Sequence, residues 1–109
     1  MSQKDQVREL IIQALKKAAQ IRDLKGGVIG WTRARIYAAL VMRERFTIKW
    51  EYQNSQNPNK SQKDQVREYL IQALKKAAQI PDLNGGVIGW MRARMYCKQV
   101  MRERLTQHG

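Results

Sequence analysis

Apolar residues in the first part of the chain recur at steps of three and four, and polar residues fill the positions between them. A period near 3.6 residues predicts an amphipathic helix with one buried face. Ser2 stands before this pattern with Asp5 three positions later, which resembles a capping box. We therefore expect a helix that begins after Ser2 and ends within residues 23–27. Its apolar stripe is Val7, Leu10, Ile11, Ala14, Leu15, Ala18 and Ile21.

A second helix is predicted from about Trp31 to Phe46. Gly26 and Gly27 precede it and supply backbone conformations that a turn between helices requires. One side of this helix should face the core, and it carries Trp31, Ala34, Tyr37, Ala38, Val41 and Met42. The opposite side is also largely apolar and carries Thr32, Ile36, Ala39 and Leu40. The two helices together predict an αα-hairpin.

The same unit is written twice. Residues 2–47 return as residues 61–106 at a constant offset of 59, and 36 of the 46 aligned positions are identical. A unit of this size alone buries little apolar surface, and two units can share one core. We therefore predict an all-α single domain over residues 1–109, in which two tandem αα-hairpins form a pseudo-two-fold four-helix bundle, a single-chain dimer. Residues 2–47 are the first hairpin, 48–60 a linker and 61–106 the second. The expected core is Val7, Ile11, Ala14, Leu15, Ala34, Tyr37 and Val41 with their copies.

The segment after the first copy alternates between apolar and polar residues. Phe46, Ile48, Trp50 and Tyr52 would share one side of an extended segment. If that segment folds back over Ala39 and Leu40, it covers the first copy alone. The pattern therefore predicts that Ala39 and Leu40 are less exposed than their counterparts Lys98 and Gln99.

Ten positions differ between the copies, and most of them are apolar. Sequence drift should first change solvated polar positions, which tolerate substitution within about 0.5 kcal/mol. The pattern favours an engineered or laboratory-evolved chain, with a natural duplication as the alternative. The pairs are Leu10/Tyr69, Ile11/Leu70, Arg22/Pro81, Lys25/Asn84, Thr32/Met91, Ile36/Met95, Ala38/Cys97, Ala39/Lys98, Leu40/Gln99 and Phe46/Leu105.

The chain carries a formal charge of +12, divided into +6 for residues 1–46, +1 for residues 47–60 and +5 for residues 61–109. A basic field of this kind favours polyanions, nucleic acid (DNA or RNA) first and an anionic membrane surface second. The alternative is that the charge only supports solubility. Arginine suits phosphate because its planar fork donates two hydrogen bonds. The candidate nucleic-acid-binding residues are Arg33, Arg35, Arg43, Arg92, Arg94 and Arg102.

The turn between the helices resembles the helix-hairpin-helix DNA-binding motif. The resemblance covers about 14 residues per copy, from Ile21 through Gly26, Gly27 and Gly30 to Ala34. The hairpin has one residue more than that motif, and Val28 stands where a glycine would be expected. The resemblance implies a hairpin that offers backbone N–H groups to a phosphate of duplex DNA.

A different function is suggested by polar residues that enter the second copy alone. Tyr69, Lys98 and Gln99 replace Leu10, Ala39 and Leu40, and they fall in the half of the hairpin remote from its turn. A lysine beside a tyrosine can support amine-based covalent catalysis on carbonyls. These three residues are the catalytic candidates of an artificial enzyme, or line the pocket of a small-molecule binder. A designed scaffold without activity is a further alternative.

The remaining chemistry is sparse. His108 is the one histidine and Cys97 the one cysteine, so no zinc or haem ligand set is expected, and no cofactor is expected. The sequence has neither a phosphate-binding P-loop nor a Ser-His-Asp trio. No apolar run approaches the roughly 20 residues that span a bilayer, and the segment MSQKDQVRE lacks the apolar part of a signal peptide. We expect a soluble, cytoplasmic type of protein without membrane insertion.

Overall fold

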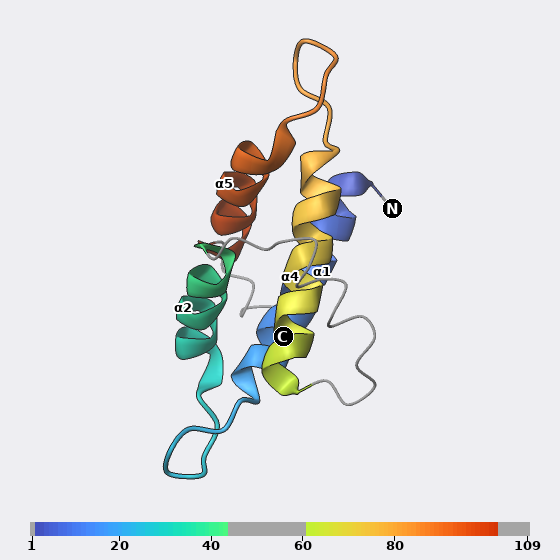
Figure 1. The fold of residues 1–109 in the computed structure, drawn as a ribbon. Helices are drawn as coiled ribbons and strands as arrows, with labels where there is room; N and C mark the ends of the chain where they lie inside the picture. The colour runs from blue at the N-terminus through green and yellow to red at the C-terminus, as the bar shows by residue number, and fades with distance from the viewer. Residues whose placement is uncertain (1, 44–60, 103–109) are drawn as a thin grey trace.

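The computed structural model describes residues 2–43 and 61–102, and this part of the chain is helical (Figure 1). Its helices are α1 (Gln3–Ala19), α2 (Gly30–Arg43), α4 (Gln62–Ala78) and α5 (Gly89–Arg102). Within these residues no strand is formed. The predicted all-α class is confirmed, and the four helices form a compact bundle.

The first helix of each copy begins where the sequence predicts. The Ser2 hydroxyl accepts a hydrogen bond from the N–H of Asp5 at 3.1 Å, and the Ser61 hydroxyl accepts one from Asp64 at 3.2 Å. These bonds satisfy one of the N–H groups that an α-helix leaves without a partner at its start. Lysines in the last turn of both helices complement the helix dipole.

The same two helices end earlier than predicted, at Ala19 and Ala78. The chain then forms a narrow turn closed by backbone hydrogen bonds, from Asp23 N to Gly27 O at 2.7 Å and from Ile29 N to Ile21 O at 2.9 Å. Gly26 takes a φ of +92° within this turn, a conformation that L side chains rarely adopt. The second copy repeats this geometry with Gly85 at +90°. Residues between Ala19 and Asp23, which the sequence pattern assigned to the end of the helix, therefore belong to the turn.

Helices α1 and α4 lie antiparallel and form the most extensive packing in the bundle. The side-chain Nε2 of Gln3 donates to the carbonyl of Lys76 at 3.0 Å, and that of Gln62 donates to the carbonyl of Lys17 at 3.1 Å. Each helix start is thereby attached to the other helix's end. Helix α2 packs on α1 and α5 on α4, so that α2 and α5 follow one another along one side, with the hairpin turns at opposite ends (Figure 1).

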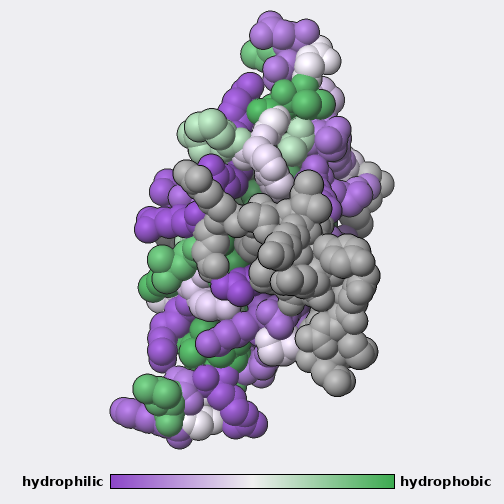
Figure 2. All heavy atoms as spheres, in the orientation of Figure 1, coloured by the Kyte–Doolittle hydropathy of each residue, from purple (hydrophilic) through white to green (hydrophobic). Residues whose placement is uncertain are grey.

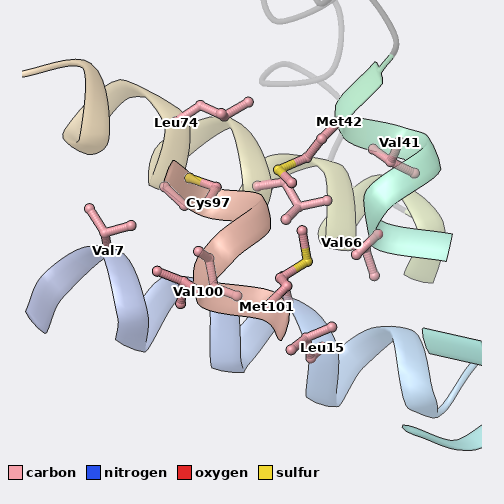
Figure 3. Close-up of a cluster of buried hydrophobic side chains, with 14 of the residues drawn as sticks. Val7, Leu15, Val41, Met42, Val66, Leu74, Cys97, Val100 and Met101 are labelled. Atoms are coloured by element: carbon pink, nitrogen blue, oxygen red, sulfur yellow. The ribbon is translucent and has the colours of Figure 1, made fainter. Parts of the chain in front are cut away.

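One apolar core runs through all four helices. Figure 3 shows Val7 of α1 and Val100 of α5 in the same cluster, with the side chains of Met42 and Met101 directed to its middle. Every predicted core position is buried except Tyr37 and Tyr96, which are half-buried and pack at its edge. The contacts cross between the two copies, so that neither copy encloses the core alone.

The predicted difference in exposure between the copies is wrong. Leu40 is 53% exposed and its counterpart Gln99 is exposed as well, while Ala39 and Lys98 are both half-buried. The outer face of α2 is therefore open to solvent like that of α5. The segment 46–52 that was expected to cover it, and the linker 48–60, lie outside the described residues.

This exposure also changes the interpretation of the positions that differ between the copies. Among the nine pairs that the structure describes, only Ile11/Leu70 and Ala38/Cys97 are buried in both copies. Ile36 and Met95 are 58% and 65% exposed, and the two pairs at the turn are exposed too. Most of the differing positions that the structure describes are therefore exposed or half-buried, although many of them are apolar. The inference of an engineered origin loses that support.

Candidate functional site

Helix α2 and the C-terminal half of α5 line a hollow of about 310 Å³. Four cationic side chains line it: Arg35 and Arg43 from α2, and Lys98 and Arg102 from α5. We call this the cationic hollow. Apolar and small side chains complete its wall, namely Thr32, Ile36, Ala39 and Met101. Along the side of the molecule that holds α2 and α5, Figure 2 shows hydrophilic side chains interspersed with hydrophobic ones.

The repeat explains why these cations gather. Arg43 and Arg102 occupy equivalent positions of the two copies, and both lie in the last turn of their helices. Because the two helices approach each other by their C-terminal halves, these residues line one hollow together. Positions 39 and 98 are equivalent as well, and both line it. The second copy places Lys98 there and thereby adds a charge that the first copy, with Ala39, lacks.

The electrostatics of the cationic hollow favour an anion. No aspartate or glutamate is among the described residues that line it. Guanidinium groups donate paired hydrogen bonds to phosphate oxygens, and an ammonium group adds a compact charge. The arrangement can bind phosphate groups.

Arg33 and Arg92 lie away from this hollow, beside the hairpin turns. Arg33 Nη1 lies 3.6 Å from Asp23 Oδ2, and Arg92 Nη1 lies 3.8 Å from Asp82 Oδ2. Both arginine side chains are largely exposed. The remaining candidate, Arg94, is half-buried on α5 and is not among the residues lining the hollow. The structure thus brings together three of the six candidate arginines, and it adds Lys98 to them.

The hairpin turns do not present the N–H groups that the helix-hairpin-helix resemblance implies. In the second copy the Asp82 carboxylate accepts hydrogen bonds from Asn84 N at 2.8 Å and Gly86 N at 3.0 Å. In the first copy Asp23 Oδ1 accepts from Lys25 N at 2.9 Å. A carboxylate already occupies these donors, and it would repel a phosphate at the same place. The same two carboxylates form the ion pairs with Arg33 and Arg92.

The three catalytic candidates are not brought together. Lys98 lines the cationic hollow, whereas Gln99 faces a different hollow beside Pro81 and Arg92. Tyr69 lines a third hollow, mostly with residues of the first copy. A lysine and a tyrosine act jointly on a carbonyl only within hydrogen-bonding reach of the same atom. Their separation leaves the pocket interpretation without support from geometry.

The hollow that contains Tyr69 was missed by sequence reasoning. It measures about 700 Å³ and is lined by Trp31, Tyr69, Lys16, Lys17, Gln13, Gln20, Gln62, Ala19, Val28 and Gly30. Sequence reasoning placed Tyr69 beside its own partner helix α5. The antiparallel packing of α1 on α4 instead places it beside Trp31 of the other copy. Trp90, the counterpart of Trp31, is 49% exposed.

The one cysteine lies within the core. Cys97 is fully buried, and desolvation raises the pKa of its thiol to about 12. A thiol is nucleophilic and binds metals as the thiolate, so Cys97 is inert at neutral pH. In the described ranges no three residues among His, Cys, Asp and Glu gather in a group that could hold a metal ion. His108 lies outside those ranges. None of the helices described is both long and apolar enough to cross a bilayer.

Comparisons of this chain with protein-family models, with curated proteins and with solved structures gave no match.

Proposed function

We propose that this protein binds a polyanion, nucleic acid in particular, through the cationic hollow between α2 and α5. The observation that carries the proposal is the convergence of Arg35, Arg43, Lys98 and Arg102 on one hollow with no carboxylate among its described lining residues. Four like charges repel one another unless an anion neutralises them. A row of phosphates supplies several negative charges at once, which a single small anion does not.

The proposed architecture is a single-chain form of a two-fold dimer. Its support is a pair of equivalent contacts between the copies. Gln3 bonds to Lys76 and Gln62 bonds to Lys17, where Gln62 is the copy of Gln3 and Lys76 is the copy of Lys17. In such an arrangement the equivalent residues Arg43 and Arg102 meet at the cationic hollow. A homodimer of the ancestral unit would present the same arginines without a linker.

The contacts expected are with the phosphate backbone. Arginine and lysine bonds to phosphates position a protein on nucleic acid and carry no sequence information. The protein is therefore expected to bind without strong sequence preference, with an affinity that falls as salt rises because bound counterions are released.

The test is a fluorescence-anisotropy titration of a labelled duplex between about 50 and 200 mM salt. The wild type should bind at the lower salt, with a log–log slope of about 0.9 for each phosphate contacted. The variant R35Q/R43Q/K98Q/R102Q should bind weakly and with a shallower slope. DNA and RNA duplexes and single strands of equal length are titrated in parallel to identify the preferred nucleic acid.

The matched control is K4Q/R33Q/K63Q/R92Q, which loses the same number of charges from exposed positions outside the hollow. It should retain most of the wild-type affinity. Equal weakening of both variants would show that overall charge, and not the hollow, carries the binding. If no nucleic acid binds at about 50 mM salt, the proposal is wrong and a scaffold without this activity is favoured.

A further inference from the structure

We infer that the hollow between the two copies at Trp31 and Tyr69 holds an unpaired nucleotide of a single strand. This inference rests on the proposed function and adds a preference within it. We call this hollow the aromatic groove. Its volume of about 700 Å³ is within the range of small-molecule sites.

The aromatic groove combines the groups that recognise a nucleotide. Trp31 begins α2 and Tyr69 lies in the middle of α4, and both line the groove. Aromatic side chains stack on nucleobases irrespective of the base, because every base presents a flat π-face. Trp31 is half-buried and packs against the core, so its ring is held in place rather than free to rotate in solvent.

Cationic and amide groups line the same groove. Lys16 and Lys17 belong to the last turn of α1, and their ammonium groups suit the phosphate of a nucleotide. Gln13, Gln20 and Gln62 add side-chain amides, which donate to and accept from base edges. The Gln62 amide nitrogen already donates to Lys17 O at 3.1 Å, which fixes one wall of the groove. No carboxylate is among the described residues that line it.

A base in a duplex is stacked between its neighbours and cannot enter such a groove without being extruded, which costs a few kcal/mol. A single strand meets no such cost. The aromatic groove therefore predicts a preference for single strands, while the cationic hollow binds phosphates of either form.

The repeat provides the matched variants. Leu10 occupies the position in the first copy that Tyr69 occupies in the second, so the position that would face Trp90 by the repeat carries a leucine. Tyr69→Leu installs a residue that this fold accepts at the equivalent place. Tyr69→Phe retains the ring and removes only the hydroxyl. Leu10→Tyr builds the second groove.

The experiment measures binding of a thymidine oligomer of about ten nucleotides and of a duplex of equal length, at about 50 mM salt. Trp31 fluorescence is followed in a background where Trp50 and Trp90 are replaced by Phe. The single strand should quench Trp31 and the duplex should not. Y69L should weaken single-strand binding by about tenfold, within the range known for base stacking on aromatic side chains, and leave duplex binding unchanged. Y69F should bind like the wild type, and L10Y should bind the single strand more tightly.

Two outcomes separate this inference from the proposed function. Binding of both nucleic acids that Y69L and L10Y leave unchanged would overturn the aromatic groove and keep the cationic hollow. A single strand that binds without quenching Trp31 would also overturn it. Absence of all binding would overturn the proposed function and this inference together. Thermal unfolding of each variant, followed by circular dichroism, establishes that the bundle is intact.

Discussion

Arg43 and Arg102, which stand at equivalent positions 59 residues apart, line the same hollow between α2 and α5. This relationship follows from the way the helices meet, with the last turns of α2 and α5 close to each other. A residue in the last turn of the repeated unit is therefore presented twice in one place. The positive charge of this repeated arginine is therefore concentrated at the hollow between α2 and α5.

The shared core predicts a large cost for truncating a central leucine. Leu15 is fully buried in contact with the cluster, so Leu15→Ala should lower the free energy of unfolding by about 2–5 kcal/mol. Leu24 is fully exposed at the tip of a hairpin turn, so Leu24→Ala should change it by less than about 0.5 kcal/mol. Urea unfolding followed by circular dichroism measures both. Similar costs for the two leucines would contradict the assignment of the core.

The geometry of the turn between α1 and α2 predicts that its two glycines differ in how well they tolerate substitution by alanine. Gly26 has a φ of +92° with open space where a Cβ would stand, so Gly26→Ala should cost about 1–2 kcal/mol from backbone strain alone. Gly27 has an ordinary φ and equal space, so Gly27→Ala should be neutral or slightly stabilising. The measurement is the unfolding free energy of the two variants and of Gly85→Ala. An equal effect of G26A and G27A would contradict the turn geometry.

The two side-chain hydrogen bonds between α1 and α4 predict that their removal lowers the free energy of unfolding by different amounts. Gln62→Ala removes the donor to Lys17 O and should cost about 0.5–1.5 kcal/mol, because that bond is partly buried. Gln3→Ala removes the equivalent but exposed bond to Lys76 O and should cost less. The two sites lie at opposite ends of the helices, so the double variant should equal the sum of the single variants. A larger cost for Gln3→Ala than for Gln62→Ala, seen in thermal unfolding, would contradict this order.

Local patterns predicted the helices well. The three- and four-residue steps identified the buried stripe of α1, and the Ser2–Asp5 spacing located its start, because both depend on neighbours along the chain. The helix end was placed too late because the turn at Arg22 and Val28 is closed by a backbone bridge. Propensity alone does not reveal such a bridge.

The sites could be predicted only in part. Arg43 and Arg102 were identified from their residue type, but their common hollow depends on how α2 meets α5. Tyr69 was placed beside α5, whereas packing between the copies places it with Trp31. The repeat indicates that two units associate, but it does not predict the orientation in which they pack. The cover predicted over Leu40 is not seen, because a folded surface retains many exposed apolar atoms.

The buried thiol predicts a dependence of stability on alkaline pH. Desolvation raises the pKa of Cys97 from 9.0 to about 12, so the folded state holds the proton more tightly than the unfolded state. The resulting stability is complete below about pH 9 and is lost as pH rises toward 12, by about 1.4 kcal/mol per pH unit. The variant Cys97→Ala has the alanine that the first copy has at the equivalent position, Ala38. Without a thiol, it should lack this pH dependence of stability.

Urea unfolding at pH 8, 9.5 and 10.5 compares the two proteins. At pH 8 the variant should be less stable than the wild type by about 1 kcal/mol, because a small cavity remains. Above pH 9 this difference should shrink and then reverse, since other titrating groups are common to both. Parallel pH profiles would show that the thiol does not titrate differently in the folded state.

The central claim is that nucleic acid binds at the cationic hollow, and Lys98 and Ala39 test it most directly because they are equivalent positions that both line it. The measurement is the slope of log affinity against log salt for duplex binding by Lys98→Ala, Ala39→Lys and the wild type. If the lysine contacts one phosphate, the slope should become shallower by about 0.9 in K98A and steeper by about 0.9 in A39K. Slopes that are the same in all three proteins would contradict the claim.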